Sequence, residues 1–203
     1  MIKNIIFDLG GVFIEFNPNK LLNYFSINEN DKQILMDNVF ATKEWSMMDK
    51  GLLVEQDMYE IVSKRIPSYL WEQAHFLIFH WNEIAQKYID VSDYAKELKT
   101  RGYNLFLLSN ASKRVYEKCW TKIKSNELFD GYVVSAYVKM LKPDKCIYEH
   151  LLNKYSLNPN ECVFIDDNEE NVKAAISCKM KGIVHNGDIN TLKSSLESIL
   201  ETR

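Results

Sequence analysis

The stretch Ile5-Ile6-Phe7-Asp8-Leu9-Gly10-Gly11 (residues 5–11) joins an apolar run to an acidic residue and two glycines. Apolar residues without polar alternation are typical of a strand that is buried on both faces of a parallel sheet. We therefore predict a strand over Asn4–Leu9. The two glycines favour a tight turn just after Asp8, at the carboxyl end of that strand.

Four further apolar runs of this kind follow residue 100. They predict strands over Asn104–Leu108, Tyr132–Ser135, Cys162–Ile165 and Gly182–His185. Segments with the spacing of amphipathic helices precede, separate or follow them, at Ser92–Thr100, Lys113–Ile123, Cys146–Lys154, Glu170–Lys179 and Ile189–Leu200. Strands that alternate with helices predict an α/β fold, in which a parallel sheet carries helices on both faces.

Residues 18–88 interrupt this alternation. Their apolar residues recur at helical spacing, and no run among them resembles a strand. We predict an all-helical domain at 18–88, inserted into an α/β core domain formed by residues 1–17 and 89–203. Trp45, Trp71 and Trp81 are expected to pack the inserted helices rather than to line a pocket.

The composition excludes several classes of protein. The 203 residues include 25 Lys and Arg against 28 Asp and Glu, and the net charge of −3 argues against nucleic acid as a partner. Asp8 ends the first apolar run early, so we expect no signal peptide and no membrane span in a soluble, cytoplasmic protein. Four cysteines without a Cys-x-x-Cys pair are expected to be reduced thiols in the core rather than disulfides or zinc ligands.

Polar residues gather where the predicted strands end. Asp8 ends the first strand, Ser109-Asn110 follow the second and Asp166-Asp167 follow the fourth, while Lys142 lies in the loop after the third. Parallel α/β sheets bind ligands beyond the carboxyl ends of their strands. Each residue alone also fits a turn or a helix N-cap. Their shared location favours a single site.

Four motifs, in this order, resemble those of the haloacid dehalogenase (HAD) superfamily of aspartate-nucleophile hydrolases: Phe-Asp8-Leu-Gly-Gly-Val, Leu-Leu-Ser109-Asn110, Lys142-Pro-Asp and Phe-Ile-Asp166-Asp167-Asn-Glu-Glu-Asn171-Val. The resemblance covers nearly the whole chain. It implies a sheet of strand order 5-4-1-2-3 and a helical cap after the first motif, where the insertion is predicted. It also implies a short flap hairpin before the cap, which the alternation of Val12, Ile14 and Phe16 fits.

The resemblance implies a catalytic role for Asp8 and a metal cofactor. Asp8 would be the nucleophile that attacks phosphorus and becomes an aspartyl phosphate. The implied cofactor is Mg²⁺, held by Asp8, the backbone carbonyl of Gly10 and Asp167, with Asp166 ligating directly or through water.

The remaining motif residues are implied to bind and neutralise the phosphoryl group. Ser109 and the backbone N–H of Asn110 would hold phosphoryl oxygens, and Lys142 would neutralise charge on the nucleophile and the transferred group. Asn171 is implied to position Lys142 or the metal-bound waters.

Gly10 departs from the superfamily pattern. Its phosphatases usually carry a second Asp there, which protonates the leaving group and then activates water, and such assistance is worth roughly 10²–10⁴-fold. Three explanations stay open: a substrate with an acidic leaving group, such as a sugar 1-phosphate; a replacement acid, for which Glu15 is the candidate; or residual machinery. The resemblance to sugar-1-phosphate phosphatases with the same Asp-Leu-Gly motif favours the first.

The sequence thus predicts a Mg²⁺-dependent phosphatase of a small phosphorylated metabolite, with a sugar phosphate favoured and with neither nucleic acid nor membrane as partner. One alternative is a metal-independent 2-haloacid dehalogenase. Asp166 and Asp167 argue against it, because carboxylates clustered near Asp8 repel one another unless a cation lies between them. The other alternative, a non-catalytic binding protein on the same fold, does not account for a nucleophile, a lysine and an acid pair together.

Overall fold

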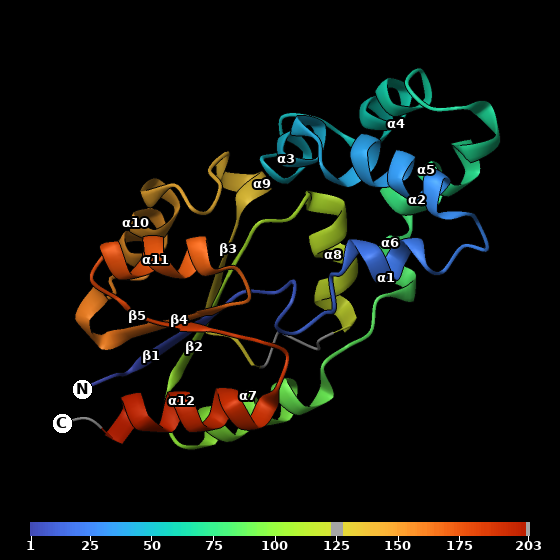
Figure 1. Ribbon diagram of the computed structural model, residues 1–203. Helices are drawn as coiled ribbons and strands as arrows, with labels where there is room; N and C mark the ends of the chain where they lie inside the picture. The colour runs from blue at the N-terminus through green and yellow to red at the C-terminus, as the bar shows by residue number, and fades with distance from the viewer. Residues whose placement is uncertain (123–127, 202–203) are drawn as a thin grey trace.

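The computed structural model of the chain describes residues 1–122 and 128–201. Within them, five strands form one parallel sheet of order β3-β2-β1-β4-β5 (Figure 1). This confirms the predicted α/β fold and strand order. The strands are β1 (Asn4–Phe7), β2 (Asn104–Ser109), β3 (Gly131–Val134), β4 (Cys162–Asp166) and β5 (Lys181–Val184).

The two faces of the sheet bury alternate residues of the central strand. Ile5 and Phe7 belong to an apolar cluster with α7 (Ile89–Thr100), α8 (Lys113–Lys122) and α12 (Ile189–Glu201). Ile6 belongs to a second cluster, with α10 (Lys145–Lys154) and α11 (Glu169–Ser177) on the other face. Figure 1 shows α7 and α12 side by side below the sheet and α10 with α11 above it. Because both faces are covered, Ile5, Ile6 and Phe7 of β1 are all apolar.

The helices of the core lie close to their predicted positions. The first begins three residues earlier than predicted, at Ile89, and α11 ends two residues earlier, at Ser177. Ile123, the predicted end of the helix that begins at Lys113, lies outside the described residues. A short helix, α9 (Ser135–Val138), follows β3 directly. The loop after α9 carries Lys142.

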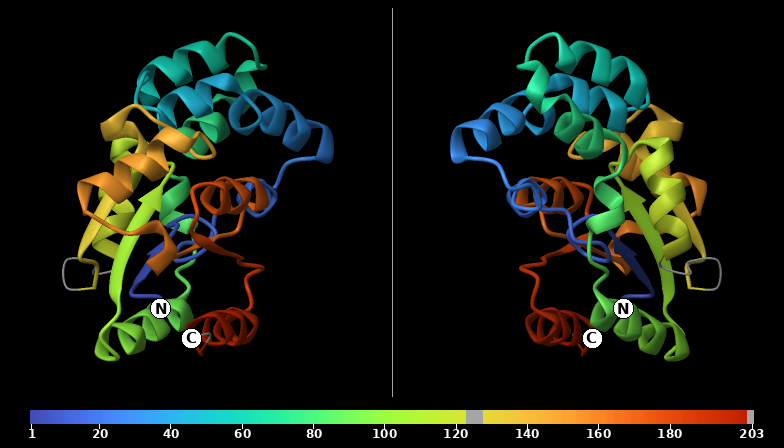
Figure 2. Two further views of the ribbon diagram at one scale, coloured as in Figure 1. Left: turned by 90° about the vertical axis from the view of Figure 1, so that its left-hand side faces the viewer. Right: turned by 90° about the vertical axis from the view of Figure 1, so that its right-hand side faces the viewer.

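We use the name cap for residues 18–88, the boundaries predicted from the sequence. Its residues form helices and turns and no strand. Figures 1 and 2 show the cap beyond one end of the sheet, where α3 lies next to α9. Its elements are α1 (Pro18–Leu22), α2 (Glu29–Leu35), a π-helical turn (Met36–Phe40), α3 (Lys43–Asp49), α4 (Glu55–Ser63), a 3-10 turn (Ser68–Leu70), α5 (Trp71–Phe79) and α6 (Trp81–Ile84).

The predicted flap hairpin of Val12, Ile14 and Phe16 is wrong. The backbone N–H groups of Phe13 and Ile14 both donate to the carbonyl of Leu9, which makes a tight turn instead. Ile14 then forms only isolated bridges, to Gly10 and Lys87. Phe13 is as completely buried as Val12 and Ile14, so the alternation does not separate an inner from an outer face.

The prediction for the three tryptophans is only partly right. Trp71 is 44% exposed, and its indole donates to the carbonyl of Ser63. Trp45 and Trp81 line a cavity between cap and core, whereas they were expected only to pack the inserted helices. As predicted, none of the four cysteines forms a disulfide, but only Cys119 and Cys162 are buried. None of the described helices has the length and apolar character that a membrane span requires.

Candidate active site

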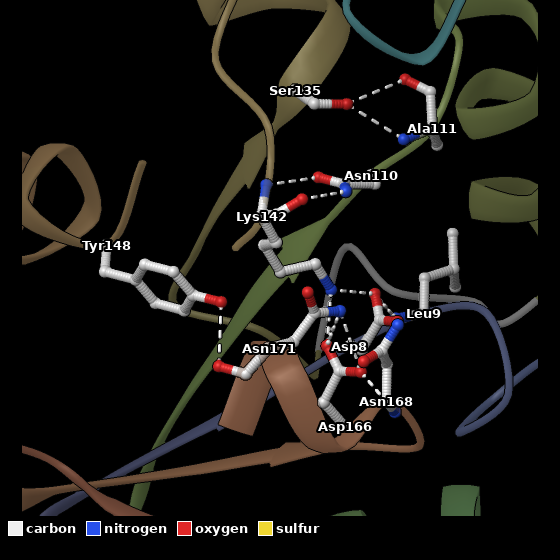
Figure 3. A network of polar contacts seen from close by, with 10 residues as sticks. All are labelled: Asp8, Leu9, Asn110, Ala111, Ser135, Lys142, Tyr148, Asp166, Asn168 and Asn171. Carbon is white, nitrogen blue, oxygen red and sulfur yellow. Dashed lines mark hydrogen bonds and ion pairs between the residues drawn. The ribbon is translucent and has the colours of Figure 1, made fainter. Parts of the chain in front are cut away.

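Asp8 lies directly after β1, at the centre of the sheet's carboxyl edge. Its backbone N–H donates to the carbonyl of Ile165 in β4, at 2.8 Å. Its carboxylate Oδ1 accepts the backbone N–H of Leu9 at 2.7 Å and lies 2.8 Å from Nζ of Lys142 (Figure 3). Both contacts reach the same oxygen, so the carboxylate is oriented through Oδ1.

Lys142 reaches Asp8 from the loop between α9 and α10. Its ammonium is buried and bridges two carboxylates, Oδ1 of Asp8 and Oδ2 of Asp166, the latter at 2.6 Å. The loop itself is held by Asn110, whose side-chain amide donates to the Lys142 carbonyl and accepts the Lys142 N–H, both at 2.9 Å. The motif position of Asn110 suggested only a role for its backbone, and nothing in the sequence indicated this use of its amide.

Asp166 ends β4 and is completely buried. Besides Lys142, its oxygens accept the backbone N–H of Asn168 at 2.8 Å and the side-chain amide of Asn171 at 3.1 Å to each oxygen. The carbonyl of Asn171 accepts the hydroxyl of Tyr148 at 2.9 Å. Asn171 is therefore linked to Lys142 through Asp166, which both residues contact.

Asp167 completes a group of three carboxylates that can hold a cation. Oxygens of Asp8, Asp166 and Asp167 lie within 4.8 Å of one another. Gly11 has φ of +71°, and a Cβ built there would overlap the Asp167 carboxylate. Glycine is needed at this position both for its left-handed backbone and for the close approach of Asp167.

The charges of this group are not balanced by the protein alone. Burial, together with Asp166 and Asp167, raises the pKa of Asp8 to about 7 against the lowering effect of Lys142. Loss of hydration and the neighbouring Asp166 raise the pKa of Asp167 to about 6, although the residue as a whole reaches solvent. The pKa of Lys142 is raised, because Asp8 and Asp166 outweigh its burial. One ammonium among three carboxylates leaves negative charge that a hard divalent cation fits.

A cavity of about 260 Å³ opens over these residues. Asp8, Gly10, Ser109, Asn110 and Asp167 line its core side. Ser109 is the last residue of β2 and is buried. The other walls are mostly apolar side chains from the turn after β1, the cap and α8: Ile14, Phe16, Trp45, Met48, Ile78, Trp81, Val115 and Cys119. Asp49, at the end of α3, is a charged cap residue in the same lining.

Glu15 does not face this cavity. Its carboxylate pairs with Lys20, and both residues line a different groove together with Tyr24. Gly10 itself lies in the cavity wall. Glu15 is therefore not placed to replace the acid that position 10 lacks.

A sequence model of the family of haloacid dehalogenase-like hydrolases matches residues 5–185. The chain belongs to this family. It is 25% identical to the sesquiterpene phosphatase astK of Aspergillus oryzae, over 99% of this chain and 95% of that protein. It is also 25% identical to a D-ribitol-5-phosphate phosphatase of Bacteroides thetaiotaomicron, over 85% and 86% of the two chains. Among solved structures, a HAD family enzyme of Bacteroides thetaiotaomicron in complex with magnesium has a TM-score of 0.73 at 23% identity, over 94% and 98% of the chains.

Membership agrees with the arrangement at the edge of the sheet. The chain is a HAD-like hydrolase, and phosphatases are among its relatives at low sequence identity. The motif residues Asp8, Ser109, Asn110, Lys142, Asp166 and Asp167 all lie at one end of the sheet. The cap residues that line the cavity belong to none of the four motifs.

Proposed function

We propose that this HAD-like hydrolase is a Mg²⁺-dependent phosphatase that acts on a small phosphate monoester through an aspartyl-phosphate intermediate. The observation that carries the proposal is the buried Asp8, Lys142 and Asp166 group with Asp167 beside it. Its surplus negative charge suits a divalent cation, and a carboxylate at the cavity floor suits nucleophilic attack on phosphorus.

Each residue of the group has a distinct task in this proposal. Asp8, oriented through Oδ1, attacks the phosphorus atom. Ser109 and the backbone N–H of Asn110 hold phosphoryl oxygens, and Lys142 offsets the charge of Asp8. Asp8, Asp167, the Gly10 carbonyl and Asp166, directly or through water, would hold Mg²⁺. Bound there, the metal supplies positive charge next to the transferred phosphoryl group.

The same charges argue against the two alternatives. A 2-haloacid carries its own carboxylate, which Asp8, Asp166 and Asp167 would repel with only Lys142 to compensate. A binding protein without catalysis has no need of Lys142 and Asp166 fully buried together, because removing ions from water costs several kcal/mol, on the order of the energy their pairing returns.

The cavity wall favours an apolar alcohol as the leaving part of the substrate. The described residues that line the cavity include no Lys, Arg or His, and Asp49 is the single charged one among those from the cap. Sugar hydroxyls buried without hydrogen-bond partners cost about 1–3 kcal/mol each, whereas Trp45, Met48, Ile78 and Trp81 favour aliphatic or aromatic groups. In place of the sugar phosphate expected from the sequence, we propose a monoester of a largely hydrocarbon alcohol. The sesquiterpene phosphatase among the relatives supports this choice.

Phosphate release from the purified protein tests both parts of the proposal. The substrates are n-alkyl phosphates of increasing length, sugar 1-phosphates and sugar 6-phosphates, each with Mg²⁺ and with a chelator. Each buried methylene adds about 0.8 kcal/mol, so kcat/KM is expected to rise up to about fourfold per carbon until the cavity is filled. A preference for sugar phosphates would overturn the substrate class. Folded protein that releases no phosphate from any ester in Mg²⁺ would overturn the phosphatase.

A further inference from the structure

The proposed reaction needs a proton donor that position 10 does not supply. In an in-line displacement the leaving oxygen lies on the far side of phosphorus from the attacking oxygen. Asp8 attacks from the core, so the leaving oxygen faces the cap. The cavity contains a carboxyl group on that side. Resting on the proposed function, we propose that Asp49 of the cap is the general acid and base of this phosphatase, in place of the aspartate that Gly10 lacks.

The end of α3 is fixed against the core, which holds Asp49 at the cavity. The Ser135 hydroxyl of α9 donates to the Asp49 carbonyl. Two residues on, the Gly51 carbonyl accepts the ammonium of Lys139. Gly51 has φ of +67°, and a Cβ there would overlap the carbonyl of Ala136. Asp49 thus belongs to the cap by sequence but is positioned by α9 of the core.

The surroundings of the Asp49 carboxyl suit a group that alternates between acid and base. Burial raises the pKa of Asp49 to about 7, against lowering by hydrogen bonding from the Ser112 N–H and the Trp45 side chain and by the charge of Lys142. Glu55 of α4 raises it further. Asp8 and Asp167 are the other carboxyl groups in the lining of this cavity. A carboxyl with its pKa near neutrality is populated in both protonation states at the pH of the reaction.

The proton and electron pairs balance over the two steps. In the first step, Asp8 Oδ bonds to phosphorus, the bond from phosphorus to the ester oxygen breaks, and that oxygen takes its electron pair and the proton of Asp49. The alcohol leaves, and Asp49 is now a carboxylate. In the second step, Asp49 removes a proton from water as the water oxygen attacks phosphorus. The bond between phosphorus and Asp8 Oδ breaks, and its electron pair returns to the Asp8 carboxylate. Phosphate leaves and Asp49 is protonated again.

Gly10 is not required by the backbone, which makes a rescue experiment possible. A Cβ added at Gly10 would meet only the Cβ of Phe16, at an ordinary contact distance of 3.7 Å. A carboxyl group introduced by Gly10→Asp therefore enters the cavity wall without a steric conflict at its Cβ. In a protein that carries Asp49→Asn, this carboxyl group at position 10 would supply the missing acid from the core.

Asp49 has a structural neighbour that serves as a matched control. Glu55 also joins the cap to the start of α8, because its carboxylate accepts the Ser112 hydroxyl at 2.7 Å. Unlike Asp49, Glu55 is not among the residues that line the cavity. If Asp49 only holds the cap in place, Asp49→Asn and Glu55→Gln should change the enzyme in the same way.

The test compares an alkyl and an aryl ester in Asp49→Asn, Glu55→Gln and the wild type. Hexyl phosphate has a poor leaving group and p-nitrophenyl phosphate a good one. For Asp49→Asn we expect kcat on hexyl phosphate to fall about 10²–10⁴-fold. On p-nitrophenyl phosphate it should still release a rapid burst of one nitrophenol per enzyme, because forming the intermediate from this ester needs no acid. The double variant with Gly10→Asp should regain hexyl phosphate turnover. Glu55→Gln should keep its turnover of both esters, with a pH profile moved to lower pH because a charge that raises the pKa of Asp49 is gone.

The outcomes separate this inference from the proposed function. Wild-type protein without Mg²⁺-dependent turnover overturns the phosphatase itself. If the wild type turns over and Asp49→Asn slows the nitrophenol burst by the same factor as the release of hexanol, or loses nothing on hexyl phosphate, Asp49 is not the acid. Should Asp49→Asn fail to fold, the wild type still decides the question. A rate of intermediate formation that falls steeply as the leaving group becomes more basic would exclude any general acid, and a shallow dependence would support one.

Discussion

Asn110 and Lys142 are joined by a reciprocal pair of hydrogen bonds, both 2.9 Å long, between the side-chain amide of one and the backbone of the other. The two residues are 32 positions apart: Asn110 directly follows β2, and Lys142 lies in the loop between α9 and α10. The amide donates and accepts at once, so it holds the Lys142 loop in one orientation. The buried ammonium then reaches Asp8 and Asp166 together.

Asn110→Ala is expected to lower kcat/KM about 10²-fold, because the lysine loop loses the contact that sets its distance from Asp8. The free energy of unfolding should fall by about 1–3 kcal/mol, since the Lys142 N–H and carbonyl lose their partner. Urea denaturation and phosphate release measure the two effects. Asn153→Ala, an exposed asparagine on α10, is the control and should change neither. Unchanged kcat/KM in Asn110→Ala would show that the loop does not depend on this amide.

Lys142→Met removes the ammonium and leaves Asp8 and Asp166 buried without it. Breaking a buried ion pair from one side costs about 3–5 kcal/mol, and we expect the free energy of unfolding at pH 8 in chelator to fall by that order. The loss should shrink toward pH 5, because Asp8, whose pKa is raised to about 7, is protonated there and no longer repels Asp166. Urea denaturation at the two pH values is the measurement, with Lys145→Met on the surface as control. A loss that is equal at both pH values would mean that charge is not its cause.

The core and its motif residues could be predicted because their positions follow from short-range rules. A parallel sheet places Asp8, Ser109 and Asp166 at one edge once its strands are known, and apolar runs such as 5–7 and 162–165 mark those strands. The predicted helices of the core fall within a few residues of the observed ones, because the spacing of their apolar residues is also a short-range signal.

The cap side of the site could not be predicted because it depends on how helices pack. Trp45 and Asp49 lie on one short helix, and nothing in its spacing tells which side chains meet the core. Their orientation comes from contacts that are distant in sequence, such as Ser135 with the Asp49 carbonyl. The flap prediction failed similarly, because Phe13 finds a buried place that an alternating pattern assigns to solvent.

Gly11→Ala is expected to weaken Mg²⁺ binding at least tenfold, because the added methyl group displaces the Asp167 carboxylate. Its backbone strain, of about 1–2 kcal/mol, is separate from that collision. Gly187→Ala supplies the strain alone, since Gly187 has φ of +85° and open space around its Cβ position. Calorimetric titration with Mg²⁺ should therefore show weaker binding only in Gly11→Ala. Equal Mg²⁺ affinity in the two variants would remove Asp167 from the metal site.

The stabilisation that Mg²⁺ gives the folded protein is expected to grow from pH 5 to pH 8. The pKa of Asp8 is raised to about 7 and that of Asp167 to about 6, from an ordinary value of 3.8. Groups whose pKa is raised by folding stabilise the folded state fully below about pH 4 and lose that contribution as pH rises through 6 and 7. The metal-free protein thus loses this contribution over the range in which the carboxylates become able to bind a cation.

Thermal unfolding with Mg²⁺ and with chelator, at half-unit pH steps, measures this coupling. The difference in Tm between the two conditions cancels every titration that the metal does not affect, so only groups coupled to Mg²⁺ contribute to its pH dependence. Asp167→Asn should reduce the difference at pH 8 and flatten its dependence on pH, because one of the two titrating ligands is gone. A difference that is constant from pH 5 to pH 8 in the wild type would mean that Mg²⁺ binds away from Asp8 and Asp167, and the metal site proposed at the edge of the sheet would have to be abandoned.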